Sequence, residues 1–173
     1  MSADERAAAH DLFLLTMKPM LYVANVDEDK VGEVPARIMG QGPIAICAEV
    51  EAELAELDAA EAAEYLESLG LERSGLETLA QAAYHLLGLQ SYFTAGPKEV
   101  RAWTVRVGAK APEAAGVIHS DFERGFIKAK TISFDDFVAL GGETGAREAG
   151  KLRMEGKDYV VQDGDVMEFM FNV

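Results

Sequence analysis

The side chains best suited to chemistry come directly after two apolar segments. Asn25 and Glu28 follow the apolar run at residues 20–24, and a second run occupies residues 44–46. If both runs are parallel strands, their carboxyl ends meet at the edge where α/β sheets bind ligands. An amide can bond a purine ring nitrogen, and a carboxylate can accept from amino groups of a base. Alone, an Asn after a strand is more often a turn residue, but two such strand ends favour a base-binding edge. The predicted base-binding residues are Asn25, Val26, Glu28, Cys47 and Ala48.

A site for the phosphates of a nucleotide is not visible in the sequence. The segment 145–152 matches the phosphate-loop pattern G-x-x-x-x-G-K-[ST] except at its last position, where Leu152 cannot ligate magnesium. The preceding residues 137–142 do not read as a strand that feeds a helix. Phosphoryl transfer depends on positioned phosphates and metal. We therefore expect no catalytic residue and no hydrolysis of ATP by this chain alone.

Metal and redox sites are not expected either. Cys47 is the single cysteine, so an internal disulfide and a cysteine-built zinc or iron–sulfur site are excluded. His10 and His85 lie in helical patterns without a second ligand at metal spacing. His119 has acidic neighbours, but we interpret it as a capping or surface residue rather than a catalytic base.

Composition and charge indicate an ordinary globular protein of 173 residues, 49% of them hydrophobic and 27% charged. Thirty acidic and 16 basic residues give a net charge of −14, which argues against non-specific coating of nucleic acid. The excess lies in residues 1–88, with 17 acidic and 5 basic residues, against 13 and 11 in residues 89–173. No apolar run approaches the roughly 20 residues of a membrane span. Residues 1–6 lack the features of a secretory signal, so we expect a cytoplasmic protein with no membrane partner.

The second half offers a candidate contact surface for RNA. Trp103 lies in a predicted strand between Arg101 and Arg106, a pattern similar to surfaces on which RNA bases stack. Lys128 and Lys130 lie in another predicted strand. Solvated strand edges explain the same cations. Period-2 alternation places Trp103 on a mostly apolar face, which favours the core as its position.

The elements that would position the base-binding edge form a short βαβ unit. Residues 4–15 read as a helical end, which Pro19 stops. The apolar runs 20–24 and 44–46 are typical of parallel strands buried on both faces, and the sixteen residues between Val26 and Pro43 leave room for one or two helical turns. Capping boxes at 58–61 and 74–77 predict two helix starts, the second with an apolar face that packs and with its end at Gly88.

Residues 89–173 read as strands with one helix. A hairpin is expected over 89–94 and 100–107, a helix over 112–122, and strands over 126–134, 157–161 and 166–171. Alternation along the last strand places Met167, Phe169 and Phe171 on one face, which we expect to be core. The order ββαβ is typical of a small α+β roll, and we place the domain boundary near Gly88.

Several blocks of sequence strongly resemble one family. They are 15–19, 22–28, 89–96, 98–103, 118–126, 156–159, 164–166 and 171–173. Together they resemble the carboxyl-terminal part of the Obg-like ATPases, the YchF family. The resemblance implies an α/β remnant of a P-loop nucleotide-binding domain at 19–88, preceded at 1–18 by the end of a helical insertion. It implies a TGS domain, an α+β β-grasp (ubiquitin-like) fold, at 89–173.

The resemblance also implies roles for the candidate residues. In that family the Asn-x-x-Glu segment, here 25–28, replaces the base-reading Asn-Lys-x-Asp of GTPases and goes with acceptance of ATP. Cys47 and Ala48 would occupy the place of a Ser-Ala backbone contact. The parent family binds ATP, sometimes GTP, with Mg²⁺, and associates with ribosomes. Its phosphate-binding loop and magnesium-coordinating segments have no counterpart in this sequence.

We therefore expect weak binding of an adenine nucleotide and docking onto the ribosome through residues 89–173. The expected contacts are Arg101, Arg106, Lys128 and Lys130. Two alternatives stay open: one piece of an ATPase that works once its missing half is supplied, or a β-grasp module that binds proteins. Unpaired edges of a two-strand sheet would expose residues 20–24, so self-association is a further expectation.

Overall fold

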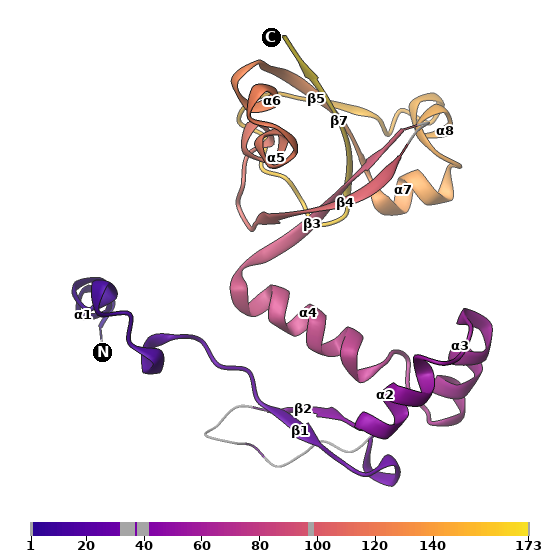
Figure 1. The fold of residues 1–173 in the computed structure, drawn as a ribbon. Helices are drawn as coiled ribbons and strands as arrows, with labels where there is room; N and C mark the ends of the chain where they lie inside the picture. Colours follow the sequence, from indigo (N-terminus) through magenta and orange to yellow (C-terminus); the bar gives the residue numbers. More distant parts are fainter. Residues whose placement is uncertain (1, 32–36, 38–41, 97–98, 173) are drawn as a thin grey trace. The chain divides into compact units, whose positions relative to one another are not determined.

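The computed structural model describes residues 2–31, 37, 42–96 and 99–172 of the chain. It divides into two compact units, Met1–Leu87 and Gly88–Val173 (Figure 1). The division falls between α4 and β3, where Gly88 adopts a positive φ of 63° that favours glycine. Each unit is described by itself below. No helix among the described residues is long and apolar enough to cross a bilayer.

The first unit begins with short helical segments. The helix α1 (Ala3–Ala8) starts at a capping box between Ser2 and Glu5. Two 3₁₀ turns follow, η1 (His10–Leu12) and η2 (Leu15–Met17). The predicted helical end is thus confirmed, although Phe13, with φ of 50°, interrupts it.

Two short parallel strands form the sheet of the first unit. Strand β1 (Val23–Asn25) pairs with β2 (Ile44–Ile46), with Asn25 opposite Ile46. The predicted parallel pair is confirmed, but burial of the first run on both faces was wrong, because Met20 is 51% and Val23 46% exposed. A sheet of two strands cannot cover both faces of either. The 3₁₀ turn η3 (Glu28–Lys30) begins the connection, whose later part lies outside the described residues.

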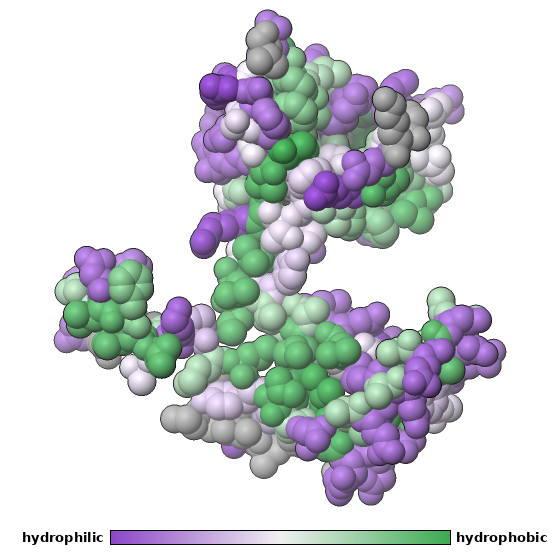
Figure 2. All heavy atoms as spheres, viewed as in Figure 1, coloured by the Kyte–Doolittle hydropathy of each residue, from purple (hydrophilic) through white to green (hydrophobic). Residues whose placement is uncertain are grey.

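Three helices follow β2: α2 (Ala48–Leu54), α3 (Ala59–Ser68) and α4 (Gly75–Leu87). The capping box at Asp58 is confirmed, and the Oγ of Ser74 accepts a hydrogen bond from the Glu77 amide at 3.1 Å. The helix α4 packs on β2, yet its Leu76 and Leu87 are exposed, so the predicted packed face is only partly correct. Figure 2 shows hydrophobic residues over β1, β2 and α4, and hydrophilic residues over α2 and α3.

The second unit contains a five-stranded mixed sheet in the order β4-β3-β7-β5-β6. The strands are β3 (Leu89–Ala95), β4 (Val100–Arg106), β5 (Phe126–Ser133), β6 (Arg153–Glu155) and β7 (Asp165–Phe171). Strands β3 and β7 are parallel, and the other neighbours are antiparallel. The predicted hairpin and the ββαβ order are confirmed. The predicted strand 157–161 was wrong: Val160 forms an isolated bridge with Lys110, and β6 lies earlier.

Helices flank this sheet. They are α5 (Ala111–Ile118), α6 (Ser120–Arg124), α7 (Phe134–Ala139) and α8 (Glu143–Glu148). The single helix predicted over 112–122 is two helices, because His119 is extended and its Nδ1 accepts the Asp121 amide hydrogen bond at the start of α6. His119 is thus a capping residue, as predicted. Strand β5 ends one residue early because Ser133 caps α7.

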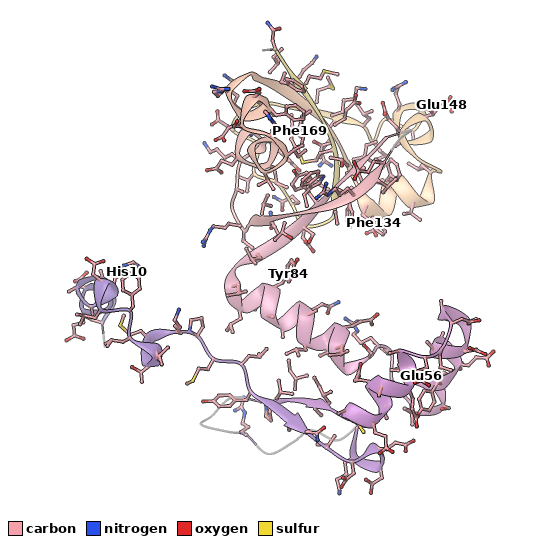
Figure 3. The ribbon with its side chains drawn as sticks, in the orientation of Figure 1. His10, Glu56, Tyr84, Phe134, Glu148 and Phe169 are labelled. Atoms are coloured by element: carbon pink, nitrogen blue, oxygen red, sulfur yellow. The ribbon has the colours of Figure 1, made fainter. Side chains whose placement is uncertain are left out.

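The core of the second unit lies between the sheet and α5. Tyr92 is fully buried, and its hydroxyl donates to the Ala114 carbonyl at 2.9 Å. Met167 is 2% exposed, and Phe169 packs edge-on against Tyr92 with ring centroids 5.8 Å apart. Phe169 lies on the side of β7 that faces α5 and α6 (Figure 3). The face predicted from alternation along β7 is confirmed as core.

A buried carboxylate fixes the chain just before β7. Asp165 is 2% exposed and accepts hydrogen bonds from the Tyr159 hydroxyl at 2.6 Å and the Gln162 amide at 2.9 Å. Arg153 pairs with the other carboxylate oxygen at 3.4 Å. The carboxylate is therefore compensated by donors from β6 and from the loop 156–164.

Candidate functional site

The two predicted strand ends meet. Asn25 ends β1, Ile46 ends β2, and Cys47 precedes the first residue of α2, Ala48. The Val26 amide donates to the Ile46 carbonyl at 2.9 Å, and the Ala48 amide donates to Oδ1 of Asn25 at 3.3 Å. Parallel pairing thus places both segments at one carboxyl edge.

This contact decides which part of Asn25 can face a ligand. Its Oδ1 accepts from Ala48, so the Nδ2 amino group is the atom left to donate. A purine N7 is an acceptor and matches that donor. Glu28 is exposed in η3, three residues further along the chain. Its carboxylate, an acceptor, suits the exocyclic amino group of adenine.

Cys47 and Ala48 have different parts in this edge. Cys47 is 4% exposed and belongs to the packed interior, so its thiol is not presented to a ligand. Ala48 is exposed at the start of α2. Both residues can therefore contribute backbone groups, and only Asn25 and Glu28 contribute polar side chains.

Tyr65 is a neighbour that the sequence analysis missed. Its hydroxyl, on α3, donates to the Glu53 carboxylate on α2. This hydrogen bond, with smaller contributions from nearby Glu28 and Cys47, raises the pKa of Tyr65 to about 12. The phenol therefore stays neutral at physiological pH. No local motif announces such a contact, because it joins two helices across twelve residues of sequence.

The segment that partly matches a phosphate loop is a packed helix. Gly145 lies in α8, and a Cβ at this position would come within 1.9 Å of the Leu140 carbonyl. The rejection of a phosphate site here is confirmed. Among the described residues no three His, Cys, Asp or Glu side chains gather as a metal site. The described residues thus fit a purine base but do not fit its triphosphate and magnesium.

The two predicted arginine contacts on β4 lie on opposite faces of the sheet. Arg101 shares the face of Trp103, and its guanidinium lies 4.1 Å from the centre of the indole ring. The indole NH donates to Thr94 at 2.9 Å. Trp103 is only partly buried and packs on the core, as the alternation predicted. Arg106 alternates with the buried Val105 and faces the other way.

The two predicted lysine contacts share a face of β5. Lys128 and Lys130 flank the buried Ala129, so they lie on the face opposite the core, as Arg106 does. The ammonium of Lys130 bonds Glu168 at 2.7 Å and Glu143 at 3.2 Å, which raises the pKa of the lysine. Strand β5 is three strands from β4, about 14 Å across the sheet. The structure therefore brings the two lysines together and leaves the two arginines apart.

Comparison with known proteins gives consistent matches along the chain. The family model YchF-GTPase_C, described as a protein of unknown function (DUF933), matches residues 89–172. Ribosome-binding ATPase YchF of Escherichia coli O157:H7 is 56% identical over 100% of this chain and 50% of its own length. The protein of the same name from Bacillus subtilis is 54% identical over 98% of this chain and 50% of its own length.

A solved structure extends the match to the fold. The Schizosaccharomyces pombe YchF GTPase superposes with a TM-score of 0.81 at 33% identity, covering 98% of this chain and 48% of that one. The chain spans about half the length of the curated relatives that it matches. With this identity along its whole length, the chain belongs to the YchF family.

Proposed function

We propose that this chain carries the base-recognition edge and the ribosome-docking unit of a YchF-type ATP-binding protein in the cytoplasm, without the parts that hold phosphates. The observation that carries the first part is the hydrogen bond from Ala48 to Asn25, which orients the amide without any ligand. The second part is supported by relatives named ribosome-binding ATPases. In this proposal residues 19–88 correspond to the end of a nucleotide-binding domain and residues 89–173 to a TGS domain.

Base selectivity tests the first part. Calorimetry with adenosine, guanosine and cytidine should give weak binding that is strongest for adenosine. Glu28→Ala should lower that affinity about tenfold, whereas Glu56→Gln, a surface carboxylate on the loop after α2, should leave it unchanged. Equal affinities for the three nucleosides would contradict base recognition by this edge.

Ribosome binding tests the second part. The cations on the outer face of the sheet, Arg106, Lys128 and Lys130, form one candidate surface, and Arg101 on the core side belongs to another. Arg106→Glu with Lys128→Glu should reduce co-sedimentation with ribosomes and weaken its salt dependence. Lys157→Glu, at an exposed residue, is the matched control. Arg101→Glu, assayed separately, shows whether the core side contributes. Unchanged co-sedimentation of every variant would exclude these four cations as contacts.

The alternative of an ATPase piece rests on a different observation. Apolar side chains of the first unit are widely exposed, and they include Leu12, Phe13, Leu15, Met20 and Val23. Such a surface is expected where further strands or helices are to be added. Co-expression with the amino-terminal half of a relative should then yield a complex with ATPase activity. Self-association of the chain alone, seen by light scattering, would instead show that a second copy covers this surface.

A further inference from the structure

A groove opens in the second unit at the point where two parallel strands separate. Within the described residues, β3 and β7 are in register at the single pair Phe93 and Val166. The residues directly after this pair, Thr94–Gly96 and Met167–Phe169, form two sides of a groove of about 470 Å³. Its apolar lining consists of Trp103, Ile118, Phe122, Met167 and Phe169.

The aromatic walls of this groove are held in place by contacts outside it. The indole of Trp103 is fixed by the hydrogen bond to Thr94 and by the Arg101 guanidinium. Phe122 stacks on Phe171 with ring centroids 3.8 Å apart. Phe169 is fixed by Tyr92. A ligand would therefore meet a preformed apolar surface and would not have to order it, which favours binding.

Carboxylates stand at both sides of the groove. Glu99, in the turn before β4, and Glu168, on β7, belong to its lining. Each makes an ion pair, Glu99 with Arg101 at 3.9 Å and Glu168 with Lys130 at 2.7 Å. Their side chains nevertheless remain 67% and 56% exposed, so both carboxylates can still accept from a ligand.

We propose that this groove binds a basic polypeptide segment that inserts an apolar side chain between Trp103 and Phe169 and places Lys or Arg beside Glu99 and Glu168. The apolar lining supplies the anchor site and the carboxylates supply charge complementarity. The net charge of −14 adds long-range attraction for a basic partner. RNA is a poorer occupant, because both carboxylates would repel its phosphates. The inference goes beyond the ribosome-docking proposal and does not depend on Arg106 or Lys128.

The single tryptophan of the chain reports directly on the groove. Trp103 fluorescence of the full chain should be titrated with the blocked peptide Arg-Leu-Lys-Leu-Arg-Leu. Two matched peptides, Arg-Ser-Lys-Ser-Arg-Ser and Glu-Leu-Glu-Leu-Glu-Leu, lack the apolar anchors and the positive charge respectively. An eight-nucleotide adenine RNA is the fourth probe. We expect a saturable change with the first peptide and at least tenfold weaker responses to the other probes.

Variants connect the response to the groove. Glu99→Gln with Glu168→Gln keeps the side-chain shapes and should weaken binding of the first peptide about tenfold, whereas Glu148→Gln on α8 (Figure 3) should not. Thermal unfolding of each variant checks that it is folded. Absence of a response to the first peptide, an equal response to the serine peptide, or a response to RNA alone would overturn the proposal. None of these results bears on ribosome co-sedimentation, so the two proposals fail separately.

Discussion

Asn25 combines two tasks in one side chain: its oxygen ties β1 to the start of α2, and its amino group is left for a ligand. Two substitutions separate these tasks. Asn25→Ala should lose the hydrogen bond to Ala48, about 0.5–1.5 kcal/mol of stability, together with adenosine binding. Asn25→Asp keeps the acceptor and should retain most of the stability, but it lacks the donor and should lose adenosine binding. Thermal unfolding and calorimetry provide the two readouts. Full adenosine affinity in Asn25→Asp would show that the amino group is not the contact.

Tyr159 predicts a loss of stability at high pH. Burial and the hydrogen bond to Asp165 raise the pKa of Tyr159 to about 12, above the ordinary value near 10. Between these values the folded protein keeps the proton that the unfolded chain loses, so the free energy of unfolding falls as pH rises through that range. Tyr159→Phe should make the fall shallower when denaturant unfolding is followed from pH 9 to 12. Tyr92, whose pKa burial also raises, keeps a residual slope in the variant. An unchanged slope would contradict the role of Tyr159.

The polar residues of the base-binding edge could be predicted from sequence because they follow apolar runs in a local pattern. The importance of Tyr65 could not, since its contact with Glu53 arises only when α2 and α3 pack. The four cations show the same limit. Alternation assigns a face to each residue of one strand, but it does not give the order of strands. The distance between Arg106 and Lys128 therefore became visible only with the sheet topology.

At the scale of elements, one glycine fixes the junction between α6 and β5. Gly125 follows α6, and a Cβ there would lie 2.1 Å from the Asn172 carbonyl, just after β7. Because this neighbour is backbone, Gly125→Ala should destabilise the second unit by about 1–3 kcal/mol in denaturant unfolding. Gly156→Ala is the matched control, since a Cβ there meets nothing within 4 Å. Equal stabilities of the two variants would contradict this close approach.

Elements were predictable where short-range rules set them. The hairpin of β3 and β4 follows from alternation around a turn sequence, and α3 follows from its capping box. The break at His119 was missed because the residues on both sides have helical character. The helix α2 was missed because Cys47 provides no side-chain cap. Strand β6 is three residues long, and its position depends on pairing with β5 rather than on its own sequence.

At the scale of the whole molecule, the two units differ in how much they bury. The second unit contains Tyr92, Ala129 and Met167 in one buried core, whereas the buried apolar side chains described in the first are few, with Ile46 and Val50 among them. Hydrogen exchange should therefore show stronger protection of the amides in β3, β5 and β7 than of those in β2 and α2. Equal protection of both units would contradict this order of stability.

The central claim concerns the whole molecule as well: it reads a purine base and has nothing to hold the phosphates. Calorimetry of adenosine and of ATP with Mg²⁺, each titrated into the same chain, tests this claim most directly. We predict equally weak binding of both ligands and no gain from magnesium, because only the base meets the protein. Binding of ATP with Mg²⁺ a hundredfold or more tighter than that of adenosine would contradict the account.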